Sequence, residues 1–144
     1  MIGVGNRMRG DDAAGLAVVD ALRERGLRGA DVVETEAEPT RLLDAWDGYD
    51  RAVVVDAVSS GADPGTVHRV DAAAGPLPHS LVRASTHHFS LGDTIELGRA
   101  LGRLPASLVV YGVEGKAFEA GGPLSPEVER GVREAVARIE EEVG

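Results

Sequence analysis

The chain has 144 residues, a hydrophobic content of 43% and a formal net charge of −9, which fit one domain over residues 1–144. The acidic charge, without a basic patch, argues against a nucleic-acid partner. Because there are no cysteines, the chain offers no disulfide, thiolate nucleophile or cysteine-bound metal. It shows no apolar run of about 18 residues and no secretion signal, so we expect a cytoplasmic protein with no membrane partner.

The first third of the chain alternates strand and helix patterns. A short strand at 2–5 runs into a glycine turn, and apolar residues at helical spacing follow over 11–25. A second strand is expected at 31–34 and a second helix at 39–46, with Pro39 in its first turn. Only Met1 and Ile2 precede the glycine turn. A misassigned start or the loss of upstream residues would explain so short a strand.

The same alternation continues to the end of the chain. The β-branched run at 51–56 is typical of a strand buried on both faces, whereas the alternation at 65–70 favours an edge strand. A loop over 72–85, a helix over 89–101 and a buried strand at 107–113 follow. Ser125, Pro126 and Glu127 carry the signals that open a last helix. The pattern predicts a single α/β domain, with a mostly parallel twisted sheet of about five strands and helices on both faces.

In such a sheet, ligands bind at the carboxyl ends of the strands. Gly3, Gly5 and Asn6 would form a turn at the end of the first strand, since glycine and asparagine tolerate unusual backbone angles. Asp11 and Asp12 follow where the first helix should begin. The plain interpretation is that they cap this helix, and the functional one is that a carboxylate is held there for chemistry.

Two more candidate groups fall at the same edge. Asp56 ends an otherwise apolar strand, where a buried carboxylate needs a partner or a metal; the alternative is a turn-forming or capping role for the loop behind it. His87 and His88 precede the third helix and point in different directions, so one of them would face the cleft. Two carboxylates and one imidazole would suit a divalent transition metal.

Other chemistries match the sequence less well. The dinucleotide-binding fingerprint lacks its third glycine, because Met8 stands at that spacing. Neither a phosphate-binding Gly-Lys-Ser/Thr motif nor the serine hydrolase motif Gly-x-Ser-x-Gly occurs. A glycosidase-type pair of carboxylates stays open, although no aromatic sugar platform accompanies it. His68 and His79 are expected on a strand surface and in a loop.

The candidate motifs occur in the order Gly3-Val4-Gly5-Asn6, Asp11-Asp12, Gly15, a strand ending in Asp56-Ala57, and Ser85-Thr86-His87. In this order and spacing the chain resembles the hydrogenase maturation endopeptidases over essentially its whole length. The resemblance implies a metal-dependent, aspartic-type endopeptidase. Such an enzyme removes the C-terminal extension from the nickel-loaded large subunit of a nickel–iron hydrogenase.

The resemblance also assigns roles to individual residues. The family's metal-contacting acid, aspartate and histidine correspond to Asp12, Asp56 and His87, with His88 as the alternative histidine. These residues would be both catalytic and metal-binding, and would complete the coordination of nickel carried by the substrate; other divalent ions are expected to fit the same site. Water would then be the nucleophile. Asp11 would be a structural cap, and the turn of Gly3, Gly5 and Asn6 would position the substrate.

The implied partner is the hydrogenase large-subunit precursor, and we expect the protein to act as a monomer. Two other functions stay open on the sequence alone. A non-enzymatic nickel-sensing or metallochaperone module that docks on the precursor would use the same three side chains without cutting a peptide. A nucleotide- or phosphate-binding domain would use the turn at 3–6, although the two aspartates beside it disfavour an anion.

Overall fold

The computed structural model describes residues 1–5, 10–27, 29–35, 38–75, 77–78, 91–116 and 123–143, and of Asp12 only the main chain. These residues form a five-stranded sheet in the order β2-β1-β3-β5-β4. The strands are β1 (Ile2–Val4), β2 (Val33–Thr35), β3 (Arg51–Val58), β4 (Val67–Asp71) and β5 (Ser107–Glu114). All neighbouring pairs are parallel except β4 and β5, which are antiparallel. The predicted fold class is confirmed, including the edge position of β4.

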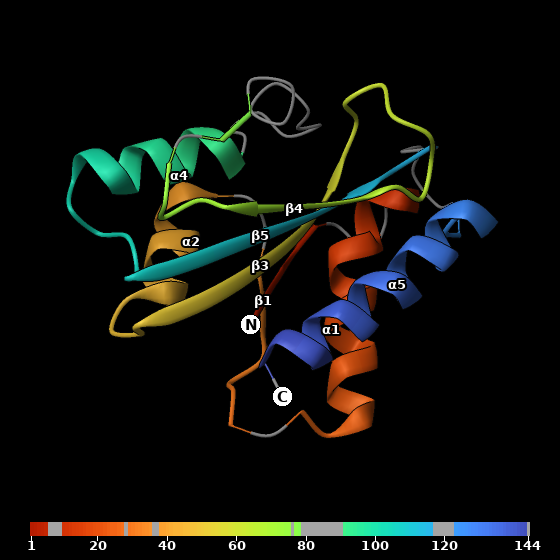
Figure 1. The fold of residues 1–144 in the computed structure, drawn as a ribbon, viewed down its shortest axis with the longest axis horizontal. Helices are drawn as coiled ribbons and strands as arrows, with labels where there is room; N and C mark the ends of the chain where they lie inside the picture. The colour runs from red at the N-terminus through yellow and green to blue at the C-terminus, as the bar shows by residue number, and fades with distance from the viewer. Residues whose placement is uncertain are drawn as a thin grey trace.

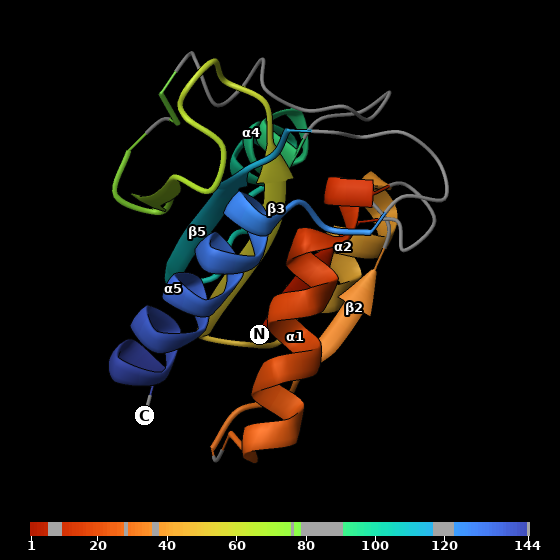
Figure 2. The ribbon, with the colours of Figure 1, turned by 90° about the vertical axis from the view of Figure 1, so that its right-hand side faces the viewer.

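Helices cover both faces of this sheet (Figure 1). They are α1 (Ala14–Arg25), α2 (Pro39–Trp46), α4 (Leu91–Ala100) and α5 (Pro126–Val143), and a 3₁₀ turn, η1 (Gly10–Ala13), precedes α1. One apolar core lies under α1 and α5, which run side by side (Figure 2), and the other lies under α2 and α4. Val53 and Val55 of β3 belong to the first core and Val54 to the second, so the strand is buried on both faces, as predicted.

Local sequence signals set several helix ends. The N-cap of α2 is Glu38, whose carboxylate accepts hydrogen bonds from the amides of Thr40 and Arg41 at 3.1 and 3.0 Å. Pro39 occupies the first helical position. These amide hydrogen bonds lower the pKa of Glu38. α1 ends at Gly26, which adopts a left-handed conformation with φ +70°.

The observed elements differ from the predicted ones where long-range pairing decides. β3 continues past Asp56 to Val58, because its ladder with β5 extends to the pair Val58 and Glu114. β4 starts at Val67 rather than at Gly65, which has φ +88° and belongs to the preceding turn. The helix predicted over 11–25 is divided into η1 and α1, and the N-cap of α1 is Ala13, without a side-chain hydrogen bond.

Candidate functional site

The strand order reverses between β1 and β3. The chain leaves β1 through α1 to β2 on one side, and α2 returns it to β3 on the other side of β1. In an open α/β sheet, the carboxyl ends of two such strands flank the crevice in which ligands bind. η1 follows β1 and packs against β3. The main chain that carries Asp11 and Asp12 therefore lies beside the strand that carries Asp56.

Two glycines let α1 approach the sheet closely enough to place η1 there. A Cβ on Gly15 would lie 2.4 Å from the carbonyl oxygen of Val55 and 2.5 Å from that of Val4. A Cβ on Gly3 would lie 2.4 Å from Cγ2 of Val19. Gly3 is thus a buried residue of β1 that contacts the helix, and not part of the turn predicted at 3–6. Gly5 follows the strand, and its amide donates to the carbonyl of Thr35 at 3.2 Å.

Asp56 is buried, with 2% of its surface exposed, and pairs with Gly112 in the β3–β5 ladder. Its Oδ1 accepts a hydrogen bond from the amide of Ala57 at 2.8 Å. The side chain lines a cavity of about 20 Å³ together with Leu77 and Leu91, which is room for about one water molecule. The amide of Ser60 in the following loop is bound by Glu114, and the alternative role of Asp56 as a capping or turn-forming residue stays a prediction.

Asp11 is fully buried, with an exposed fraction of 0%. Its carboxylate accepts hydrogen bonds from the amides of Lys116 and Ser125, at 2.7 and 2.8 Å, and from the hydroxyl of Ser125 at 2.8 Å. The prediction that Asp11 caps the first helix is wrong, since Ala13 occupies that position. Asp11 instead ties η1 to the connection between β5 and α5.

Glu114 is a further buried carboxylate at this edge, and the sequence interpretation missed it. Its exposed fraction is 2%, and it binds Ser60 and His68. His68 was expected on a strand surface, but 24% of its side chain is exposed and its Nε2 lies 3.2 Å from Oε1 of Glu114. The available signal was the one that singled out Asp56, an acidic residue at the end of an apolar strand.

The remaining predicted site residues lie outside the described part of the chain. These are Asn6, His87 and His88, and for Asp12 the side chain. His79, which was expected in a loop, also lies outside the described residues. Among the described side chains, no three histidine, aspartate or glutamate residues converge in a way that could hold a metal ion. The structure therefore places Asp56 and the main chain of Asp12 at one crevice, and leaves the third predicted ligand as a prediction.

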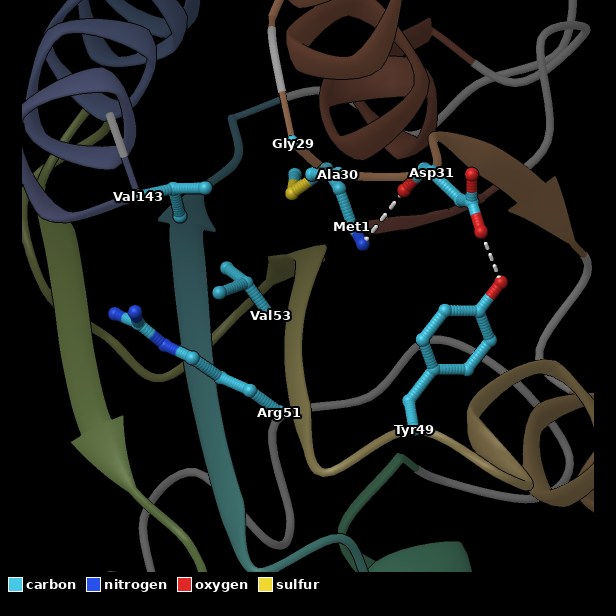
Figure 3. Close-up of a pocket in the computed structure, with 8 residues that line it drawn as sticks. All are labelled: Met1, Gly29, Ala30, Asp31, Tyr49, Arg51, Val53 and Val143. Carbon is cyan, nitrogen blue, oxygen red and sulfur yellow. Dashed lines mark hydrogen bonds between the residues drawn. The ribbon is translucent and has the colours of Figure 1, made fainter.

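A cavity of about 460 Å³ lies at the opposite edge of the sheet, where β1 and β3 begin (Figure 3). The ammonium group of Met1 donates to the carbonyl of Asp31 at 3.0 Å, and the hydroxyl of Tyr49 donates to the Asp31 carboxylate. Burial lowers the pKa of this ammonium group, against the opposing charge of Asp31. Arg51 and Val53 of β3 also line the cavity. Among the residues that the structure describes, none of those that line this cavity is a predicted site residue.

Fold and site together define a doubly wound α/β protein with buried carboxylates at the switch point of its sheet. The model of the hydrogenase maturation protease family matches residues 16–142. The chain belongs to this family, and the resemblance inferred from its motifs is confirmed. No helix among the described residues has the length and apolar character needed to cross a membrane.

Individual relatives agree with this assignment. The chain is 26% identical over 142 residues to the hydrogenase 2 maturation protease of Escherichia coli, covering 96% of this chain and 86% of that protein. It is 27% identical over 139 residues to the hydrogenase expression/formation protein HupD of Thiocapsa roseopersicina, covering 94% of this chain. The chain spans 63% of the length of that HupD.

Solved structures of the same family share the fold. The [NiFe] hydrogenase maturation protease HybD of Thermococcus kodakarensis superimposes with a TM-score of 0.73 at 28% identity, covering 99% of this chain and 97% of that one. The hydrogenase maturating endopeptidase HybD of E. coli gives a TM-score of 0.75 at 26% identity, covering 96% and 86% of the two chains.

Proposed function

We propose that this protein is the endopeptidase that removes the C-terminal extension from the nickel-loaded large subunit of a nickel–iron hydrogenase. The observation that carries the proposal is the buried carboxylate of Asp56 at the switch point, beside the turn that holds Asp12. Membership in the maturation protease family supports the reaction class. The protein would act in the cytoplasm as a monomer.

In this proposal, Asp12, Asp56 and His87 bind the nickel that the precursor carries into the crevice. Carboxylate oxygens and an imidazole nitrogen suit a divalent transition metal. The sheet supports such a role for Asp56, because β3 is held by β1 on one side and by β5 on the other. The protease then recognises the precursor through its nickel ion, and a precursor without nickel lacks the group that these side chains bind.

The proposed cleavage is a hydrolysis in which water is the nucleophile, since the chain contains neither a cysteine nor the serine hydrolase motif Gly-x-Ser-x-Gly. The oxygen of water adds to the carbonyl carbon of the scissile peptide, and the carbon–nitrogen bond then breaks. The nitrogen of the released extension takes up a proton, and the mature subunit ends in a new carboxylate. The side chains that bind the nickel hold the scissile peptide beside it, and this positioning accounts for much of the expected rate gain.

Asp56→Asn tests the assignment. The amide keeps the shape of the side chain and can still accept the hydrogen bond from Ala57, so the variant should fold. We expect its rate of cleavage of nickel-loaded precursor, followed by mass spectrometry, to fall by about 100-fold or more. Asp71→Asn is the matched control, because Asp71 is exposed and ends β4 beside the start of β5, far along the strands from Asp56. Cleavage by Asp56→Asn at the control rate would refute the ligand role.

The same assay separates the endopeptidase from a nickel-sensing module. Only a protease shortens the precursor, so an unchanged mass after incubation with wild-type protein would support the non-enzymatic alternative. Precursor prepared without nickel should stay uncut. Equal cleavage of nickel-free and nickel-loaded precursor would remove the metal from the recognition step.

A further inference from the structure

Glu114 carries a buried polar cluster that the proposed chemistry does not use. Its carboxylate oxygens accept hydrogen bonds from the amide of Ser60 at 3.0 and 3.2 Å, and the Ser60 hydroxyl also donates to it. Nε2 of His68 lies 3.2 Å from Oε1. A carboxylate with 2% exposure needs such partners. The Glu114 cluster, made of these three residues, links β5, the loop after β3 and β4.

The main chain of Glu114 holds the other end of the same loop. Its amide donates to the carbonyl of Thr66 at 2.9 Å, and its carbonyl accepts from the amide of Gly65 at 2.8 Å. The amide of Gly115 donates to the carbonyl of Val58 at 2.9 Å. The loop over 59–66 is therefore fastened near its start by the side chain of Glu114 and at its end by the main chain of the same residue.

This cluster lies next to Asp56 on one face of the sheet. Gly112 pairs with Asp56 on one side and with His68 on the other, while Glu114 pairs with Val58. Paired residues and alternate residues of a strand point to the same face, so the side chains of Asp56, His68 and Glu114 share that face. Asp56 and Glu114 are diagonal neighbours on adjacent strands, about 7–8 Å apart, whereas Asp56 and His68 lie two strands apart, at about 10 Å. A Cβ on Gly112 would lie 3.0 Å from Cγ1 of Val58, so the side chain of Val58 packs over this glycine.

The arrangement does not fit a second reactive centre. A serine nucleophile needs a histidine between the hydroxyl and the acid, but the hydroxyl of Ser60 donates to Glu114 itself. The described residues also contain no trio of side chains that could bind a metal. Amide, hydroxyl and imidazole donors that converge on one buried carboxylate instead fix the relative position of the segments to which they belong.

We infer that Glu114 is a positioning residue of the endopeptidase site: it fastens the loop after β3 and so fixes the strand end that carries Asp56. The inference rests on the proposed function, in which Asp56 contacts the nickel-bearing substrate. A misplacement of a reacting group by about 1 Å can cost about 100-fold in rate. Because the large precursor contacts more than Asp56, loosening this strand end should lower kcat while KM changes little.

Glu114→Gln tests this role, since it keeps the side-chain volume but replaces an acceptor with a donor and removes the charge. Glu142→Gln is the matched control, because Glu142 also accepts hydrogen bonds, from Arg69 and Tyr111, but sits near the end of α5. The first readout is amide hydrogen exchange over 57–66. The second is the kinetics of precursor cleavage at a temperature where both variants are folded.

We expect Glu114→Gln to speed exchange at Ser60 and to lower kcat by about 10- to 100-fold, with KM within about twofold of wild type. Glu142→Gln should change neither. If Glu114→Gln does not fold, Ser60→Ala removes one hydrogen bond of the cluster and should lower kcat in the same direction by a smaller factor. Unchanged hydrogen exchange in the Glu114→Gln variant overturns the inference. If that variant does not fold, unchanged exchange in the Ser60→Ala variant does so. So does a raised KM at unchanged kcat. Failure of the wild type to cleave refutes the proposed function, and the exchange comparison still decides whether Glu114 fastens the loop.

Discussion

The carboxylate of Asp11 is a structural group whose loss should be measurable. It accepts hydrogen bonds from two amides and one hydroxyl of Lys116 and Ser125. Asp11→Ala would leave these donors without their acceptor at a half-buried place, where each unpaired group costs about 1–3 kcal/mol. We therefore expect the free energy of unfolding, measured in urea, to fall by about 3 kcal/mol.

Asp44→Ala is the control for this measurement. The side chain of Asp44 is 68% exposed and its contact is the guanidinium of Arg103 at 3.5 Å, so the free energy of unfolding should change by less than about 0.5 kcal/mol. Equal unfolding midpoints for the two alanine variants would show that the hydrogen bonds of Asp11 contribute little to stability.

At the residue scale, the sequence predicted which edge of the sheet holds the acidic residues but not what each one contacts. The partners of Asp11 lie 105 and 114 residues away, and those of Glu114 lie 54 and 46 residues away. Patterns over a few neighbouring residues carry no information on such pairs. A capping role was therefore assigned to Asp11, and Glu114 was not singled out.

At the scale of elements, the contact between α1 and the sheet depends on Gly15. Inside a helix, a change from glycine to alanine ordinarily stabilises by about 1 kcal/mol. Here the added Cβ would lie 2.4 and 2.5 Å from two backbone oxygens of β3 and β1, which cannot move aside as a side chain can. We expect Gly15→Ala to destabilise the protein by about 2–3 kcal/mol, and to slow precursor cleavage because η1 must shift with the helix.

Gly75→Ala is the control for the steric argument, because a Cβ at Gly75 would meet no atom of the described residues within 4 Å. Its melting temperature should stay close to that of the wild type. A Gly15→Ala variant more stable than the wild type would mean that helix propensity outweighs the close approach, and that α1 can move from the sheet without cost.

Elements with strong local signals were predicted with the bounds that the structure shows. α2 is one, since the helix predicted over 39–46, with Pro39 in its first turn, has these bounds in the structure. Strand ends were less predictable, because β3 continues to Val58 only through its ladder with β5. The 3₁₀ turn η1 was missed, since its geometry goes together with contacts to segments far along the chain.

At the scale of the whole molecule, the end of α5 is joined to three strands by the side chain and the main-chain carbonyl of one residue, Glu142. The carboxylate of Glu142 accepts hydrogen bonds from Arg69 of β4 and Tyr111 of β5. The main-chain carbonyl of Glu142 accepts a hydrogen bond from the guanidinium of Arg51 of β3 at 3.2 Å. The guanidinium of Arg138 lies 5.7 Å from the centre of the Tyr111 ring. These contacts fasten the last helix across β3, β5 and β4.

The hydrogen bond from Arg69 is the main reason why the pKa of Glu142 is lowered, against the effect of burial. The carboxylate of Glu142 takes up a proton at a higher pH in the unfolded chain than in the folded protein. Its contribution to the free energy of unfolding is therefore present above about pH 4.5 and is lost as the pH falls below that value. We expect Glu142→Gln to lower the melting temperature at pH 7 by about 3 °C, which corresponds to a loss of about 1 kcal/mol for a partly screened network. The variant should also narrow the difference between the melting temperatures at pH 7 and pH 4. Glu141→Gln changes an exposed neighbour on the same helix and should do neither. If the two variants melt alike at both pH values, the hydrogen bonds of Glu142 do not contribute to the stability of the protein.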